Sequence, residues 1–410
     1  MDKAPVSPFD EIVDRSIVPA LKPRMALRQA DGKGLLGQNN KAQNNDGVFA
    51  AGVADMDFKA PPAVLAALQH RLEHGIFGYE AVPDELFLAL IDWMHKRHNW
   101  QIYQTHILRA PNILNVLAIA ASLFSEEGDG IIVQPPVFFD FFDILSENNR
   151  QLVLNPLILE NGRYRMDFVG LEAKASNPRT KMIFLCNPHN PVGRVWTADE
   201  LKKLGRICLA HNVVVISDEI HGDITFPGHD YTPFASLGPD YADNSITCLS
   251  PAKSFNIAAC CQAFTIISND KMRRAFQVEN SRLTVNKNNA FASAAMLAAY
   301  TQGGPWLNDA LIYLQQNINL VENRLQDIPH VELINPEGTF LLWLDFTKLG
   351  LEPEQLTAFL QKKAKWIVNR GEAFGTQGKG FARVNIACPR AILETALDNL
   401  SNAVSELSPQ

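Results

Sequence analysis

Short apolar runs alternate with amphipathic helical segments through the middle of the chain. Apolar residues recur with helical spacing over residues 63–74 and 84–97. Another helix is predicted after Thr197, because Thr197 and Glu200 have the spacing of a capping box. The apolar runs predict strands at residues 130–133, 152–159, 181–186, 213–217, 245–249 and 263–267. This order predicts an α/β fold with a large, mostly parallel sheet that is sandwiched by helices.

The two ends of the chain have different patterns. The first ~45 residues are polar and interrupted by proline and glycine, which is typical of an arm and a linker, and they end in an asparagine-rich stretch at 38–46. Near the other end, helical patterns at 289–299 and 306–325 precede alternating runs at 339–346 and 381–387, which predict a smaller α+β domain. We therefore expect an arm and part of the small domain at residues 1–60, a large domain at 61–300, and the C-terminal small domain at 301–410.

The composition is that of a globular protein, since 47% of the 410 residues are hydrophobic and 20% are charged. The net charge of −7 is not gathered in a block, so neither nucleic acid nor a membrane is expected as a partner. The longest apolar stretch, residues 113–124, is shorter than the ~20 residues that span a bilayer. The N-terminus does not resemble a signal peptide, and the six cysteines lack CxxC spacing, so we expect a cytoplasmic protein with reduced thiols.

Three weak signals point to other chemistry. Residues 32–37 spell GxGxxG, but no predicted strand precedes this stretch and no helix follows it, so we expect no dinucleotide site. The pairs His70/His74 and His95/His98 have helical spacing but lack the neighbouring carboxylate of zinc enzymes, and solvated helix faces explain them better. The carboxylates of residues 218–223 alternate on an extended segment and cannot all converge on one ion. No metal site is predicted.

A set of polar side chains follows the predicted strands directly. Asn190, Asp218, Ser250 and Lys253 all come shortly after the carboxyl end of a strand, where open α/β sheets bind ligands. The apolar helix that begins after Asn112 adds free N–H groups, which form an anion site. Pyridoxal phosphate requires such groups: a lysine for its aldehyde, an anion for its ring nitrogen, an amide for its 3′-oxygen, and N–H groups and hydroxyls for its phosphate.

Seven stretches of the chain carry a family resemblance. They are VADMDF (53–58), GY (78–79), QPPVF (134–138), CNPHNPVGRVW (186–196), SDEIH (217–221), SPAKSFNIA (250–258) and RVN (383–385). With these motifs in this order, the sequence resembles the fold-type I pyridoxal-phosphate enzymes, the aspartate aminotransferase superfamily, from about residue 46 to residue 389. Within it, the chain is most similar to bacterial cystathionine β-lyases, or C–S lyases, of the MalY/PatB type.

The resemblance implies how the large domain holds pyridoxal phosphate. Lys253 is implied to form the Schiff base and to move the Cα proton, and Asp218 to pair with the pyridinium nitrogen. Asn190 and His221 would lie at the 3′-oxygen, while Phe138 would stack on the ring.

The same resemblance implies contacts to the phosphate and the substrate. Ser250 and the backbone N–H groups of Asn112 and Ile113 would hold the phosphate, joined by Tyr79 of a neighbouring subunit in a homodimer with shared sites. For the amino-acid substrate, Arg383 would bind the α-carboxylate as a fork, and Asp55 is also assigned to substrate binding.

The implied activity is β-elimination from L-cystathionine or related β-thio amino acids, which gives pyruvate, ammonia and a thiol. Two alternatives stay open: a class I/II aminotransferase, and a cofactor-binding regulatory protein with little turnover. The chain departs from the family pattern at Gly52, where tryptophan is usual, at Phe138, where tyrosine is common, and at Asn112, where glycine is usual. These departures leave the cofactor groups in place and concern the substrate pocket.

Overall fold

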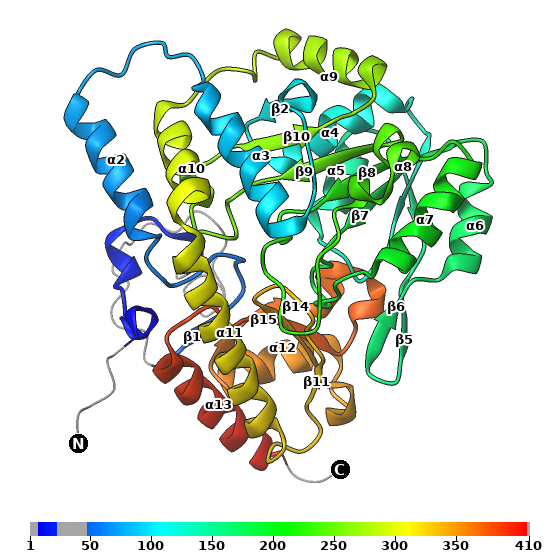
Figure 1. Ribbon diagram of the computed structural model, residues 1–410. Helices are drawn as coiled ribbons and strands as arrows, with labels where there is room; N and C mark the ends of the chain where they lie inside the picture. Colours follow the sequence, from blue (N-terminus) through cyan, green and yellow to red (C-terminus); the bar gives the residue numbers. More distant parts are fainter. Residues whose placement is uncertain (1–6, 23–46, 408–410) are drawn as a thin grey trace.

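A seven-stranded sheet forms the centre of the computed structural model, which describes residues 7–22 and 47–407 (Figure 1). Neighbouring strands are parallel except at β10, which runs antiparallel to both of its neighbours. The predicted α/β class with a mostly parallel sheet is confirmed. The strand order is β2 (Ile107–Ala110), β10 (Ala263–Ile266), β9 (Ser245–Leu249), β8 (Val214–Asp218), β7 (Thr180–Cys186), β3 (Gly130–Val133) and β4 (Gln151–Leu154).

Helices cover both faces of this sheet, because successive side chains of each buried strand point to opposite sides. In β3, Ile131 and Val133 pack into one hydrophobic cluster and Ile132 packs into another. Helices on the first face are α4 (Ile113–Phe124), α5 (Asp140–Glu147) and α9 (Asp270–Arg282). The opposite face is covered by α6 (Phe168–Ala175) and α7 (Ala198–Ala210), and towards β2 by α2 (Pro62–His74), α3 (Asp84–His98) and α10 (Ala290–Gln302).

A four-stranded antiparallel sheet forms a second unit, drawn below the large sheet in Figure 1. Its strands are β11 (Glu332–Ile334), β12 (Leu341–Asp345), β15 (Phe381–Asn385) and β14 (Asn369–Arg370). Its helices are α11 (Gly304–Leu325), α12 (Pro353–Lys362) and α13 (Arg390–Ser405). The predicted α+β pattern near the C-terminus is confirmed, whereas the domain boundaries stay a prediction.

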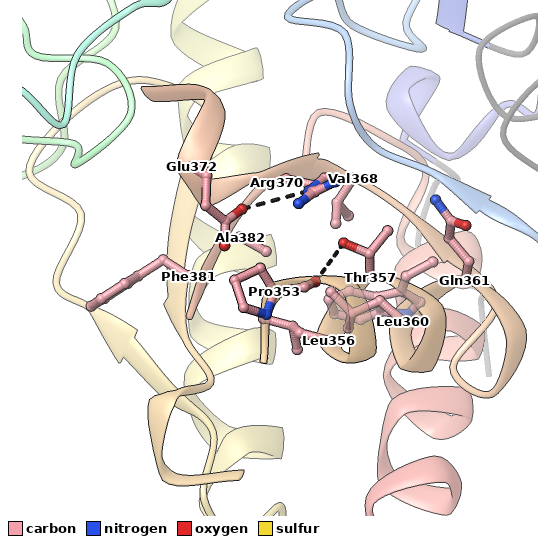
Figure 2. A pocket seen from close by; sticks show the side chains of 11 residues that line it. Pro353, Leu356, Thr357, Leu360, Gln361, Val368, Arg370, Glu372, Phe381 and Ala382 are labelled. Atoms are coloured by element: carbon pink, nitrogen blue, oxygen red, sulfur yellow. Dashed lines mark hydrogen bonds and ion pairs between the residues drawn. The ribbon is translucent and has the colours of Figure 1, made fainter. Parts of the chain in front are cut away.

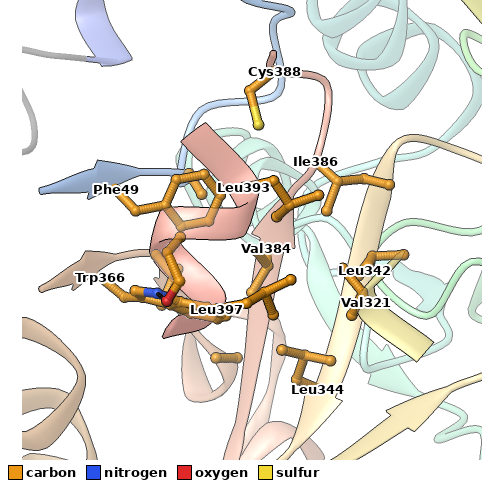
Figure 3. Packing of buried hydrophobic residues seen from close by; sticks show 14 of the residues in the cluster. Phe49, Val321, Leu342, Leu344, Trp366, Val384, Ile386, Cys388, Leu393 and Leu397 are labelled. Carbon is orange, nitrogen blue, oxygen red and sulfur yellow. Dashed lines mark hydrogen bonds between the residues drawn. The ribbon is translucent and has the colours of Figure 1, made fainter. Parts of the chain in front are cut away.

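The N-terminal side of the chain also packs into this second unit. Strand β1 (Phe49–Ala50) pairs in parallel with β13 (Trp366–Ile367). Phe49 lies edge-on to Trp366 with ring centroids 5.4 Å apart, and Figure 3 shows Phe49 beside Leu393 of α13. The first residues of the described chain therefore share a hydrophobic core with some of its last residues.

Several elements differ from the predicted ones. The run at 152–159 is not one strand but parts of two, β4 and β5 (Ile158–Glu160), and β5 forms a separate hairpin with β6 (Arg163–Arg165). Strand β2 was not predicted. The capping box of Thr197 and Glu200 at the start of α7 is confirmed. The GxGxxG at 32–37 and the asparagine-rich stretch at 38–46 lie outside the described residues.

Short helices connect these elements within the part of the chain that the structure describes. They are α8 (Pro239–Asp243) and the 3-10 turns η1 (Pro8–Asp10), η2 (Arg15–Ile17), η3 (Gln104–His106), η4 (Phe234–Leu237), η5 (Ala258–Cys260), η6 (Thr347–Leu349), η7 (Gly371–Phe374) and η8 (Thr376–Gly378). Among the described residues, no helix has the length and apolar character needed to cross a membrane.

One predicted solvated histidine is buried instead. His70, His74 and His95 are exposed, but the His98 side chain is only 8% exposed and its Nε2 lies 2.7 Å from Oδ1 of Asp223. The sequence pattern around His98 could not reveal this, because Asp223 is on a loop far away in the chain. The prediction of a solvated His98 was therefore wrong.

Candidate active site

Lys253 lies in the turn after β9, at the carboxyl edge of the large sheet. Its Nζ donates a hydrogen bond to the backbone carbonyl of Ala54 at 2.6 Å. Removal from water and the nearby Arg383 charge lower the pKa of Lys253, and the charges of Asp55 and Asp218 oppose this only in part. The structure therefore places a lysine with a lowered pKa at this edge of the sheet.

Asp218 ends strand β8 and is almost completely buried, at 5% exposure. Its Oδ1 accepts the backbone N–H of Ile220 at 3.2 Å. Burial raises the pKa of Asp218 to about 6, although this N–H and the charge of Lys253 pull it down. No ion pair to Asp218 occurs among residues 7–22 and 47–407, so the carboxylate is suited to a cationic ligand atom.

Arg383, in the middle of β15, is a buried cation with neutral acceptors. Its guanidinium donates to Asn190 Oδ1 at 2.9 Å, Gly52 O at 2.7 Å and Asn369 Oδ1 at 2.7 Å. Its Nε is buried without a hydrogen-bond partner in the described chain, and burial lowers the pKa of Arg383 to about 9. Burying a cation is costly without an anion beside it, so this arrangement favours an anionic ligand.

His221 and Ser250 add polar groups to the same edge. His221 is 3% exposed, and its Nδ1 is buried without a partner in the described part of the chain. Burial, followed by the charges of Lys253 and Arg383, lowers the pKa of His221 and keeps the ring neutral. Ser250 Oγ donates to Gln262 O at 3.0 Å and accepts the N–H of Ala252 at 3.3 Å.

The N-terminus of α4 begins at Ile113, with Asn112 as its cap. The Asn112 side chain accepts the N–H of Asn115 at 2.8 Å. The first N–H groups of an α-helix have no partner within the helix, and they favour an anion. Phe138 follows β3 and is partly buried, tilted against Phe139 at 5.1 Å.

Two predicted site residues stand apart from this group. Tyr79, between α2 and α3, is fully exposed. The Asp55 carboxylate binds Arg15 of the N-terminal arm, with Nη2 to Oδ2 at 2.5 Å and Nη1 to Oδ1 at 3.3 Å. Arg15 therefore occupies the carboxylate that was predicted to bind the substrate, and the sequence did not reveal this contact.

Two asparagines of the quoted motifs hold the segment that contacts Lys253. Asn256 accepts the N–H of Met56 at 3.0 Å and donates to the carbonyls of Met56 and Phe58 at 3.0 and 2.7 Å. Asn385 donates to the carbonyls of Val53 and Asp55, both at 2.6 Å. No role was predicted for these asparagines. Their position inside the quoted motifs was the sequence signal that could have identified them.

A separate hollow between α12 and the small sheet does not compete as a site (Figure 2). Its volume is only about 10 Å³, room for roughly one water molecule. Arg370 and Glu372 face each other across its rim at 3.6 Å. No group of His, Cys, Asp or Glu suited to a metal ion occurs in the described ranges either.

Comparisons with known proteins identify the family of the chain. The model of the family "Aminotransferase class I and II" matches residues 48–400. The chain is 43% identical over 355 residues to cystathionine beta-lyase PatB of Bacillus subtilis, covering 86% of this chain and 92% of PatB. It is 33% identical over 356 residues to protein MalY of Escherichia coli, covering 86% and 90%. The structure of the pyridoxal-phosphate-bound C–S lyase from Staphylococcus hominis matches with a TM-score of 0.86 and 31% identity, over 98% of this chain and 100% of that one. The resemblance found in the sequence is thus confirmed: the chain belongs to the aminotransferase class I and II family.

Proposed function

We propose that the protein is a pyridoxal-phosphate-dependent C–S lyase. It cleaves L-cystathionine or a related β-thio amino acid, with one water molecule, to pyruvate, ammonia and a thiol. The observation that carries the proposal is the grouping of three charged side chains. Lys253 lies close enough to Asp218 and Arg383 for both of their charges to act on it, and Asp218 and Arg383 are almost completely buried. Relatives named cystathionine beta-lyase or C–S lyase support the same reaction.

The side chains fit the cofactor in their chemistry. Lys253 would bond to its aldehyde, and the buried Asp218 carboxylate would pair with its ring nitrogen. Asn190 and the unpartnered Nδ1 of His221 would lie near the 3′-oxygen. When bound, the cofactor supplies an electron sink for the pair of electrons left at the substrate Cα.

The phosphate and the ring faces require other groups. Ser250 and the N–H groups of Asn112 and Ile113 would bind the phosphate at the start of α4. Phe138 would pack on the ring, as its partly buried position beside Phe139 allows.

The protein's own residues then have distinct tasks in the elimination. Lys253 takes the Cα proton, which its lowered pKa favours because more of the amine is unprotonated near neutral pH. Arg383 holds the α-carboxylate, which gives this buried cation a directly bonded anion, since its hydrogen-bond acceptors within residues 7–22 and 47–407 are all neutral. Asp218 keeps a negative charge at the ring nitrogen and so maintains the electron sink.

The test is to supply L-cystathionine alone and to measure pyruvate and free thiol. Product without an added 2-oxo acid supports the lyase. If products form only when a 2-oxo acid is present, the protein is an aminotransferase. Inertness of the loaded protein towards β-substituted amino acids would favour a regulatory protein. Lys253→Ala should abolish both turnover and the visible absorption band of the covalently bound cofactor.

We infer that the protein acts as a homodimer with shared sites. The loop between α2 and α3 exposes apolar side chains, including Ile76, Phe77 and Tyr79, as an interface requires. The loop is also anchored, since Asn288 donates to the Ala81 carbonyl at 3.1 Å. Tyr79 would thereby reach the phosphate of the neighbouring subunit.

Mixing inactive chains tests this arrangement. Tyr79→Ala and Lys253→Ala proteins are dissociated, mixed and reassembled. The mixture should regain about a quarter of the wild-type number of active sites, because half of random dimers are hybrids and each hybrid has one intact site. No recovery, in dimers shown to be mixed, would refute the shared site.

The cellular location is also a proposal. All six cysteines are free, and Cys186, Cys208, Cys248 and Cys388 are buried. Free thiols fit a reducing compartment, and we infer the cytoplasm.

A further inference from the structure

Asp140 is a carboxylate beside the site that the mechanism above does not use. It begins α5 and follows Phe138 and Phe139 directly. Asp140 is partly exposed, and its carboxylate makes no hydrogen bond or ion pair with any other residue of 7–22 and 47–407. A charge that is half removed from water and has no partner needs an explanation.

The surroundings of Asp140 connect it to the substrate-binding arginine. The Phe139 ring lies edge-on to the Phe374 ring at 5.6 Å, and the Arg383 guanidinium lies over Phe374 at 4.9 Å. Phe139, the residue next to Asp140, is therefore separated from Arg383 only by the Phe374 ring. In agreement, the charges of Arg383 and Lys253 both act on the Asp140 carboxylate.

The helix alone does not account for this carboxylate. An acidic residue in the first turn of a helix is favoured by the helix dipole. However, Asp143 already supplies a solvated carboxylate in that turn, and the start of α5 has no side-chain capping hydrogen bond. Burial and the like charge of Asp143 raise the pKa of Asp140, and the charges of Arg383 and Lys253 oppose this only in part.

We propose that Asp140 selects substrates by the charge of their departing thiol. This inference rests on the proposed lyase function. A partly buried carboxylate attracts a cation and repels an anion over several ångströms. The preferred class is therefore β-thio amino acids whose thiol portion carries an ammonium group, as the homocysteine portion of cystathionine does, and thiols with only a carboxylate are disfavoured.

Three cysteine derivatives of similar length test the charge preference. S-(3-aminopropyl)-L-cysteine carries a cation, S-butyl-L-cysteine is its neutral counterpart, and S-(2-carboxyethyl)-L-cysteine carries an anion. At pH 8 the wild-type protein should rank them by kcat/KM in that order, with on the order of 10-fold or more between the extremes. Asp140→Asn should shrink the spread to about 2-fold or less.

Two further variants separate charge from folding. Asp140→Glu should keep the ranking, and Asp143→Asn, on the same helix but exposed, should leave it unchanged. An unchanged spread in Asp140→Asn, or an equal loss for all three substrates, overturns the proposal.

Binding gives a second readout that does not need turnover. Dissociation constants of the three compounds, from the change in the visible absorption of the loaded protein, should follow the same order. Failure of the lyase function would therefore appear as ranked binding without pyruvate, whereas failure of the Asp140 proposal would appear as pyruvate without ranking.

Discussion

Asp223 accepts a set of hydrogen bonds that joins α3 to the segment carrying Lys253. Its Oδ1 lies 2.9 Å from Trp93 Nε1 and 2.7 Å from His98 Nε2, and its Oδ2 lies 2.7 Å from Ser254 Oγ. The Asp223 side chain is only 10% exposed. Replacing it with alanine leaves three enclosed donors without an acceptor.

The cost can be worked out from these contacts. Hydrogen bonds to a charged acceptor contribute roughly 1.5–3 kcal/mol each, and breaking a buried charged pair from one side costs about 3–5 kcal/mol. These contributions overlap, so we expect Asp223→Ala to lower the free energy of unfolding by ~3–5 kcal/mol. Asp223→Asn should cost only ~1–2 kcal/mol, because Oδ1 remains for Trp93 and His98 and the new amide can donate to Ser254.

Urea unfolding at fixed protein concentration measures these differences. Asp230→Ala is the matched control, because Asp230 is exposed on the same loop and should stay within about 0.5 kcal/mol of wild type. A cost below ~1 kcal/mol for Asp223→Ala would refute the reasoning.

The same network predicts a pH dependence. Burial raises the pKa of Asp223, but His98, Arg97 and Ser254 together lower it below its ordinary value of 3.8. A carboxyl group with a depressed pKa stabilises the fold above its unfolded pKa, and this contribution is lost as the pH falls through the folded value. The difference between wild type and Asp223→Asn should therefore narrow only below about pH 4.

Three further outcomes are expected elsewhere. Arg194→Met should lower the free energy of unfolding by about 3 kcal/mol, because Arg194 Nε lies 2.8 Å from Oε2 of Glu337 and both side chains are buried. A decrease below ~1 kcal/mol would contradict this expectation. In the cofactor-free protein, burial raises the pKa of Asp218 from 3.8 to about 6, so stability should fall as the pH rises through this interval. Asp218→Asn should remove up to ~3 kcal/mol of this pH-dependent loss of unfolding free energy. If the pH dependence measured by urea unfolding is the same in the variant and in wild type, the pKa of Asp218 is not raised in the folded protein. In the loaded protein, Arg383→Lys should raise KM for the amino acid on the order of 10-fold or more, because a lysine cannot form the fork; an unchanged KM would remove Arg383 from carboxylate binding.

The central strands could be predicted well because both of their faces are buried. Strand β3 was predicted with its observed bounds, and the predictions for β7 and β8 differed by one residue at the ends. Such strands are continuous apolar runs, which a sequence displays directly. Strand β2 was missed because Arg109 interrupts its apolar run. The Arg109 guanidinium donates to Asn288 Oδ1 at 3.0 Å, a contact that only the folded chain creates.

The site could be predicted where motifs carry the chemistry, but not where distant segments meet. Asp218 is the last residue of β8 and Lys253 lies in the turn shortly after β9, so strand prediction alone placed them at one edge. Arg15 contacts Asp55 and Asp57 from an arm whose local sequence shows no sign of it. His98 was misjudged for the same reason, because its partner belongs to another part of the chain.

The pairing of β1 with β13 bears on how the protein forms during synthesis. Phe49 and Trp366 are neighbours in space, yet the ribosome makes one of them several hundred residues before the other. At 5–20 residues per second, β1 would wait roughly 15–60 s for its partner strand. All seven strands of the large sheet precede residue 267 and can assemble in that interval. The surface that finally covers Phe49 is made near the end of translation, so this apolar strand stays without its native partner for most of that time.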